Sequence, residues 1–266
     1  MTIKPNRIEH YYETHEWEGD EVGRGYLHFS SVIYLAALLE LLFYGQAVGV
    51  VNDFYFFHTD DPNEIPVSSD LAVIDGLGPV GEDDKNDISY YIGEDGPPPR
   101  VMIEISSERT WLDDLNSKGK RSRYFALGIL EYFVFDPQQT TLWRDSWANY
   151  NRLVGWRRNP ITKGYDELVK DEAGRLWSEE LQSWLVVEGR YLRLYTRDGQ
   201  LRLTEAEAER QQRNLERARA RVALQEVLAE RQQRELERAR ADAAEQRLAK
   251  LLERLRQSGQ NPDDLI

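Results

Sequence analysis

The pattern of hydrophobic and polar residues predicts a helix followed by three strands. In residues 27–45, Val32, Leu35, Leu38 and Leu42 recur at helical spacing, and Gly45 stands where a helix would end. Three later segments are rich in valine, isoleucine or aromatic residues and are bounded by turn-forming residues, as is typical of strands. These predicted strands are residues 48–59 (VGVVNDFYFFHT), 69–75 (SDLAVID) and 101–106 (VMIEIS).

A second helix and a fourth strand follow directly. Residues 111–128 have an aspartate-rich start, a basic middle and Gly128 as a stop, which indicates a helix. Residues 131–135 are an apolar run closed by Pro137. The strand 101–106, the helix and the strand 131–135 then form one right-handed βαβ crossover. The predicted fold class is therefore α/β, with a core ordered helix, three strands, helix, strand.

Beyond this core, aromatic and polar residues alternate around glycine-containing turns as far as residue 203. This alternation predicts a β-rich extension packed on the same core, without a domain break. We therefore predict one domain over residues 1–203.

From Thr204 the composition changes to Glu, Arg, Gln, Ala and Leu, which predicts one long helix over residues 204–257. The segment ERQQRNLERARA from Glu209 returns as ERQQRELERARA from Glu230, 21 residues later, which equals three heptads. Leu215, Val222 and Leu236 share one heptad position, but neighbouring core positions are Ala or Gln. Two interpretations stay open, a solvated charged helix and a coiled coil that self-associates. Residues 258–266 are predicted to be flexible.

Composition removes several classes of function. The chain has no cysteine, which excludes disulfides and thiolate chemistry. It shows neither a long uncharged apolar run nor an apolar signal segment, so we expect no membrane partner and a cytoplasmic location. The net charge is −13, of which residues 1–200 contribute −14 and residues 201–266 contribute +1. Such an acidic chain is a poor non-specific binder of nucleic acid, and any DNA hypothesis has to meet this objection.

Glu104 is the most unusual residue of the predicted sheet. It lies between Ile103 and Ile105, where an unpaired carboxylate is costly to bury. A structural explanation is a buried ion pair with Arg100 or Arg123. The functional explanation is a strand end that opens on a ligand or a metal.

A second carboxylate and two lysines support the functional explanation. Asp70 begins the apolar run of the second strand, and Lys118 and Lys120 lie on the helix after Glu104. If the strands are neighbours, Asp70, Glu104 and the carbonyl of Ile105 converge on one divalent cation. Oxygen ligands of this kind suit Mg²⁺, with Mn²⁺ as an alternative. A lysine nearby would help to deprotonate the attacking water and to stabilise phosphate charge during phosphodiester hydrolysis.

Three blocks of the sequence are informative together: PVSSDLAVIDG, RVMIEISSERTWLDDL and YFALGILEYFVFDP. They resemble the Uma family of restriction endonucleases, within the PD-(D/E)XK nuclease superfamily. The later segments LWSEELQSWLVVEGRYLRLY and LTEAEAER, and the charged tail, also resemble one branch of this family, so the likeness runs from about residue 26 into the tail. It implies a restriction-endonuclease-like core in which Asp70 and Glu104 are metal ligands.

The resemblance has two departures. Ser69 replaces the proline that usually precedes the aspartate, and Ser106 stands where the superfamily usually has its lysine. The family pattern places a replacement lysine on the next helix. Counting forward from TWLDDL selects Lys118, which we slightly favour, and counting backward from Tyr124 selects Lys120. The two would point about 200° apart on one helix, so only one can face the site.

These observations lead to one hypothesis and two rivals. The hypothesis is a Mg²⁺-dependent endonuclease that hydrolyses DNA phosphodiester bonds with Asp70, Glu104 and Lys118 or Lys120. The first rival is a catalytically inactive member that binds DNA or assembles through its long helix as a homo-oligomer. The second rival is a scaffold in which Asp70 and Glu104 are structural ion-pair partners.

Overall fold

The α/β core has the predicted order of elements. The computed structural model describes residues 25–59, 64–77, 88–108, 110–138, 142–143, 146–148 and 151–257. Helix α1 (Tyr26–Leu42) confirms the first helix, and the apolar runs after it form strands. The long helix is confirmed as α4 (Glu205–Gln257). By its internal contacts the chain divides into two compact units after Glu205.

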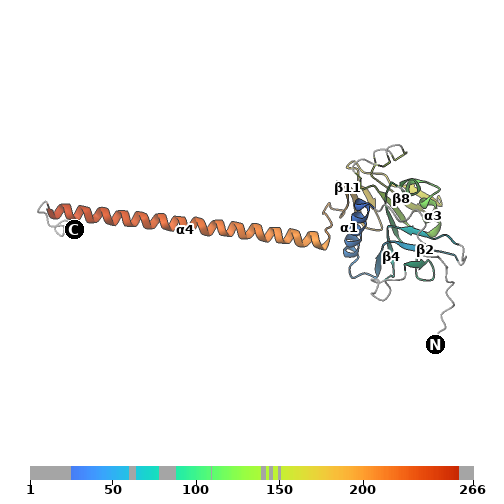
Figure 1. Ribbon diagram of the computed structural model, residues 1–266, viewed down its shortest axis with the longest axis horizontal. Coiled ribbons are helices and arrows are strands. Elements are labelled where there is room, and N and C mark those ends of the chain that lie inside the picture. Colours follow the sequence, from blue (N-terminus) through green and yellow to red (C-terminus); the bar gives the residue numbers. More distant parts are fainter. Residues whose placement is uncertain are drawn as a thin grey trace, which may run out of the picture. The chain divides into compact units, whose positions relative to one another are not determined.

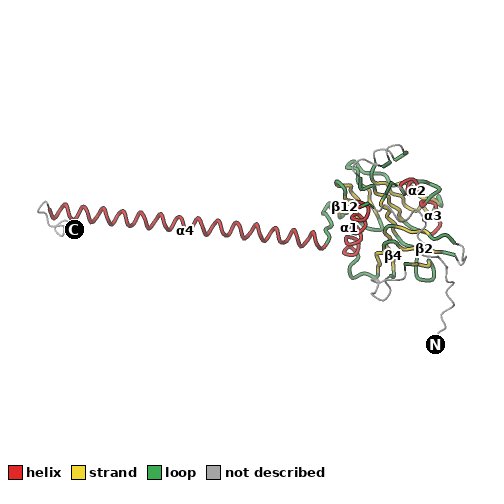
Figure 2. The backbone as a smooth tube through the Cα atoms, viewed as in Figure 1, coloured by secondary structure: helices red, strands yellow, loops and turns green. Residues whose placement is uncertain are grey.

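A six-stranded sheet forms the centre of the first unit (Figures 1 and 2). Its strand order is β1-β4-β6-β7-β8-β9, and only β6 and β7 run parallel. These two strands enclose two helices in the chain, which confirms the βαβ crossover. The strands are β1 (Val48–Val51), β4 (Leu71–Asp75), β6 (Val101–Ile105), β7 (Glu131–Phe135), β8 (Leu153–Asn159) and β9 (Gly164–Glu167).

Two smaller sheets complete the unit. One has the order β3-β2-β5, and the other is the antiparallel sheet β10-β11-β12 of the predicted β-rich extension. The first consists of β2 (Phe54–Phe57), β3 (Val67–Ser69) and β5 (Ser89–Tyr91). The second consists of β10 (Leu176–Ser178), β11 (Ser183–Glu188) and β12 (Tyr191–Tyr195).

Each face of the central sheet packs on a different layer. Because side chains alternate along a strand, Ile103 and Ile105 of β6 face α1 and the leucines of β10–β12, whereas Met102 and Glu104 face the helices after β6. This alternation fixes which side of the sheet can carry chemistry with Glu104.

Three expected elements are divided in the structure. The segment predicted as one strand over 48–59 turns at Asp53, whose φ is 59°, and contributes β1 and β2 to different sheets. The segment 69–75 likewise changes sheet at Asp70, between β3 and β4. The helix expected over 111–128 is two helices, α2 (Trp111–Leu115) and α3 (Lys120–Leu127).

Local packing explains the break between α2 and α3. Asn116 has extended backbone angles at the end of α2. Gly119 passes so close to Asp113 that a Cβ would collide with the aspartate's carbonyl and carboxylate. A glycine therefore permits the tight turn, and Lys118 lies in this turn instead of on a helix.

None of the helices in the described ranges is both long and apolar enough to cross a bilayer. The predicted flexible segment 258–266 lies outside the described residues.

Candidate active site

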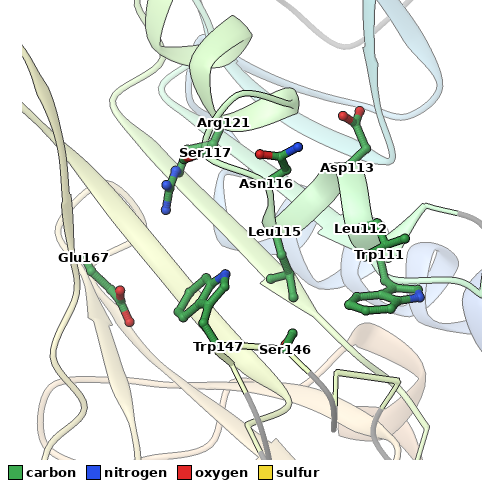
Figure 3. Close-up of a pocket in the computed structure, with 10 residues that line it drawn as sticks. All are labelled: Trp111, Leu112, Asp113, Leu115, Asn116, Ser117, Arg121, Ser146, Trp147 and Glu167. Carbon is green, nitrogen blue, oxygen red and sulfur yellow. The ribbon is translucent and has the colours of Figure 1, made fainter.

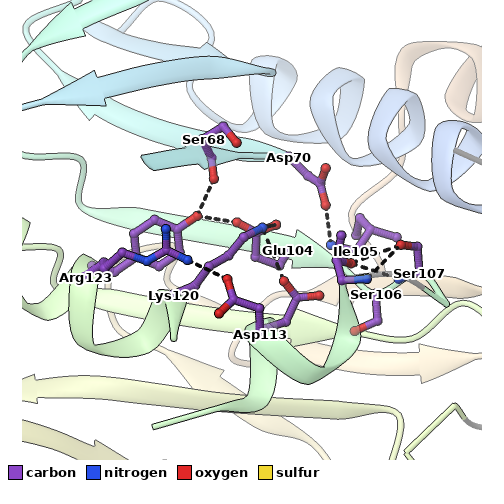
Figure 4. Close-up of polar contacts among 12 residues, drawn as sticks. Ser68, Asp70, Glu104, Ile105, Ser106, Ser107, Asp113, Lys120 and Arg123 are labelled. Carbon is purple, nitrogen blue, oxygen red and sulfur yellow. Dashed lines mark hydrogen bonds and ion pairs between the residues drawn. The ribbon is translucent and has the colours of Figure 1, made fainter. Parts of the chain in front are cut away.

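Asp70 lies at the point where the chain passes from one sheet to another. The side chain is 13% exposed. Its Oδ2 accepts a hydrogen bond from the backbone N–H of Ile105 at 2.7 Å (Figure 4). The same oxygen lies 3.1 Å from Nε2 of His28. The antiparallel pairing of β4 with β6 brings Asp70 to the end of β6. The structure therefore places Asp70 against the strand that carries Glu104.

Glu104 points from β6 toward α3. Its side chain is only 2% exposed, and Oε2 accepts a hydrogen bond from Nζ of Lys120 at 2.8 Å. The hydroxyl of Tyr124 contacts Oε1 and also lies 2.8 Å from the carbonyl oxygen of Ser68. A single hydroxyl proton cannot satisfy two acceptors at once. A protonated Glu104 would resolve this by donating to Tyr124, which would then donate to Ser68.

Lys120 is the lysine that the structure brings to this site. It opens α3, and the helical spacing of Lys120, Tyr124 and Leu127 turns these three side chains toward the sheet. By contrast, Lys118 is exposed in the turn, and its backbone N–H bonds to Oδ1 of Asn116 at 3.0 Å. The slight preference for Lys118 rested on counting forward from TWLDDL, whereas the break between α2 and α3 leaves Lys118 in the turn and places Lys120 at the start of α3.

A third carboxylate, which the sequence reasoning did not select, completes the cluster. Asp114 is fully buried, and its Oδ1 lies 3.2 Å from Nζ of Lys120. The preceding Asp113 is half exposed and pairs with Arg123 instead. In the sequence, both aspartates are typical residues for the start of a helix. The two aspartates differ in the direction in which their side chains point from α2, and this direction follows from how the helix packs.

His28 is the second residue that the sequence reasoning missed. The structure places its imidazole on Asp70. The other histidines do not join this cluster in the described part of the chain. His58 pairs with Glu64, and His10 and His15 lie outside the described residues.

The pKa values reflect how crowded the negative charges are. Burial raises the pKa of Glu104 well above its usual value; Lys120 opposes this increase, while Asp70 and Asp114 add to it. The pKa of Asp114 is raised as well, chiefly by burial. Burial also raises the pKa of Asp70, but His28, Lys120 and the Ile105 N–H outweigh it and hold the pKa below its usual value. Lys120 has a raised pKa because its three carboxylate neighbours overcome the effect of burial.

The donor set fits a hard divalent cation. The site combines three carboxylates with one lysine, so its ionised form carries excess negative charge that a cation would balance. Within the described ranges, no three acidic or histidine side chains are grouped closely enough to hold a metal by themselves. A cation on Asp70 and Glu104 would therefore depend on backbone or water oxygens. The role of the Ile105 carbonyl as a cation ligand stays a prediction, since Ile105 contacts Asp70 through its N–H.

The ion-pair partner of Glu104 is neither of the two arginines expected from the sequence. Arg100 pairs with Asp75 and Arg123 pairs with Asp113, so neither neutralises Glu104. Ser106, at the usual lysine position of the superfamily, is buried and accepts a hydrogen bond from Nε1 of Trp143 at 3.2 Å. Lys120 is the cation next to Glu104.

A cleft of about 790 Å³ runs beside α2 (Figure 3). Asp70, Glu104 and Lys120 do not line it. Its walls include Asp113, next in sequence to the buried Asp114, and Trp147, whose side chain is 53% exposed. The cleft therefore adjoins the charged cluster through α2 but does not contain it.

One family model matches more than half of the chain. The sequence model of Uma2, described as "Putative restriction endonuclease", matches residues 21–170. Among solved structures, the chain is similar to one titled "putative nuclease" from Anabaena variabilis ATCC 29413, with 10% identity and a TM-score of 0.39. That alignment covers 60% of this chain and 75% of the other. No match was found among curated proteins.

Proposed function

The chain belongs to the Uma2 family, and from this premise we propose that it is a Mg²⁺-dependent endonuclease that hydrolyses DNA phosphodiester bonds. One observation carries the proposal beyond family membership. Asp70, Glu104 and Lys120 come from three separate elements and meet at the end of β6, two of them in direct ion-pair contact. We assign residues 1–203 to the nuclease domain and propose a cytoplasmic location for the activity.

In the proposed mechanism, Asp70 and Glu104 would hold the cation. When bound, a divalent cation lowers the pKa of a water ligand and offsets charge on the phosphate. Mn²⁺ would serve as well as Mg²⁺, because both accept oxygen ligands in octahedral geometry.

The role that we propose for Lys120 does not include the proton transfer that was expected from the sequence. Its raised pKa keeps the ammonium protonated at neutral pH, so it is unsuited to accept a proton from water. It is suited to orient the attacking water and to stabilise negative charge that develops on the phosphate. Asp114, whose Oδ1 lies 3.2 Å from the same Nζ, would help to keep this ammonium in place.

The proposal predicts cleavage that depends on both carboxylates. Purified protein should nick supercoiled plasmid with Mg²⁺ or Mn²⁺, and EDTA should stop it. Asp70→Asn should lower the rate by at least about 100-fold, the scale for losing one preorganised electrostatic group. Wild-type nicking that continues in EDTA, or an Asp70→Asn variant as fast as wild type, would refute the proposal. The scaffold and inactive-member alternatives both predict no cutting at all.

The long helix supports a second proposal, self-association through α4. None of its 53 residues is buried. Most helical stability in proteins comes from packing of an apolar face, and α4 exposes Leu215, Val222 and Leu236 at one heptad position. Pairs such as Arg213–Glu209 and Arg231–Glu235 add only a few tenths of a kcal/mol each. We propose that a second copy of the chain covers this face.

Deleting residues 204–266 tests the assembly. Light scattering should show a full-length particle of at least twice the chain mass of 31.1 kDa, and a monomer after deletion. Leu215→Glu together with Leu236→Glu should have the same effect without shortening the chain. The substitutions Arg213→Glu and Arg234→Glu, on exposed charged positions, are the control. A full-length monomer would refute self-association.

A further inference from the structure

His28 lies on the buried face of α1. The spacing of His28, Ser31, Val32 and Leu35 places all four side chains on the face that packs against the sheet. Leucine or valine would fill such a position more favourably, because burying an imidazole requires hydrogen-bond partners. His28 is 7% exposed, and its Nδ1 is buried without a hydrogen-bond partner among the described residues. Its contact with Asp70 is therefore the interaction that accounts for a histidine here.

The direction of that hydrogen bond follows from chemistry. An ionised carboxylate only accepts hydrogen bonds, so Nε2 of His28 carries the proton and donates to Oδ2 of Asp70, at 3.1 Å. The N–H of Ile105 donates to the same oxygen at 2.7 Å. Both donors hold Oδ2, and neither holds Oδ1. Together they fix the rotation of the carboxylate about its last bond.

We propose that His28 is a positioning residue that fixes the Asp70 carboxylate so that Oδ1 is presented to the cation. This inference rests on the proposed function, because it takes Asp70 to be a metal ligand. The two donors come from different parts of the chain, Ile105 from β6 and His28 from α1. Helix α1 thereby acts on the site through Asp70.

Two amide substitutions test whether His28 positions the Asp70 carboxylate or only fills space. The Nε2 amide of His28→Gln can reach the position of the imidazole Nε2, whereas the shorter side chain of His28→Asn cannot. Both variants place a neutral amide in the same buried position, so effects on folding are matched. Circular dichroism and melting temperature without metal provide the check on folding.

The readout is Mn²⁺ affinity of the full-length protein, measured by isothermal titration calorimetry without DNA. We expect His28→Asn to weaken Mn²⁺ binding roughly 10-fold or more, as substitutions of residues that support a metal ligand do. His28→Gln should restore affinity to within about threefold of wild type. In cleavage assays, His28→Asn should lower kcat and leave KM for DNA unchanged.

Three outcomes would overturn the inference or its premise. If both variants bind Mn²⁺ like wild type, His28 only fills space. If both lose affinity equally, the imidazole itself is required and positioning of Asp70 is the wrong explanation. If Asp70→Asn leaves Mn²⁺ affinity unchanged, the metal site and the proposed function fail as well. If Asp70→Asn weakens Mn²⁺ binding but the His28 variants do not, only the inference about His28 is refuted.

Discussion

Replacing Lys120 with alanine is expected to lower the rate of plasmid nicking by about 100- to 1,000-fold, while Lys118→Ala retains activity close to wild type. The range is that for removing a preorganised group that stabilises charge in a transition state. Lys120 is 2.8 Å from Glu104 and 3.2 Å from Asp114, whereas Lys118 is exposed in the turn before α3. Initial rates at saturating Mg²⁺ would give the comparison.

Folding of the Lys120 variant has to be checked separately. Removing the ammonium leaves two buried carboxylates with one positive neighbour fewer, which destabilises the apo protein. Lys120→Arg keeps the charge with a different shape and should be folded but slow, since a planar guanidinium does not replace a compact ammonium. Activity that survives Lys120→Ala but is lost in Lys118→Ala would reverse the assignment.

Substitutions of two buried glutamates on neighbouring strands are expected to change the free energy of unfolding in opposite directions. Glu131 on β7 points to the opposite face of the sheet from Glu104 and bonds to Arg157 at 2.8 Å. It also accepts hydrogen bonds from the Ser178 hydroxyl and the backbone N–H groups of Glu179 and Glu180. Glu131→Ala should lower the free energy of unfolding by about 3 kcal/mol, the low end for a broken buried ion pair, because Arg157 is 36% exposed.

Glu104→Gln should instead raise the free energy of unfolding at pH 8 in EDTA. The pKa of Glu104 is raised in the folded state, so its protonated form favours folding. That contribution is complete below the unfolded pKa, near 4.5, and is lost as pH rises through the higher folded pKa. Glutamine resembles the protonated side chain and does not titrate, so its advantage over wild type should shrink toward pH 5.

Urea unfolding at pH 5 and pH 8 would measure both effects. The same Glu104→Gln protein should be inactive in nicking, since it lacks a carboxylate ligand. A stabilised but inactive variant is the expected sign of a residue retained for function at a cost in stability. If Glu104→Gln destabilises the protein as Glu131→Ala does, Glu104 is a structural ion-pair partner, as the scaffold alternative holds.

The contrast between the two glutamates shows the limit of what the local sequence can predict. Both lie in apolar strands, and both are buried. Only their partners distinguish them. Glu131 meets an arginine from β8, a hydroxyl from β10 and backbone N–H groups just after β10, whereas Glu104 shares one lysine with Asp114.

The sequence alone determined the periodic features of this protein. The spacing of apolar residues gave α1, the strands β6 and β7 with their crossover, and the long α4, because helix and strand periods are local properties of the chain. It also singled out Asp70 and Glu104, since a carboxylate in an apolar run is unusual in any context.

Only the tertiary structure decided which residues meet. His28 contacts Asp70 across 42 positions of sequence and Ile105 contacts it across 35, distances at which no local pattern specifies a partner. The choice between Lys118 and Lys120 depended on the close approach of Gly119 to Asp113, which ends one helix and starts another in a new phase. The same packing buried Asp114 and left Asp113 at the surface.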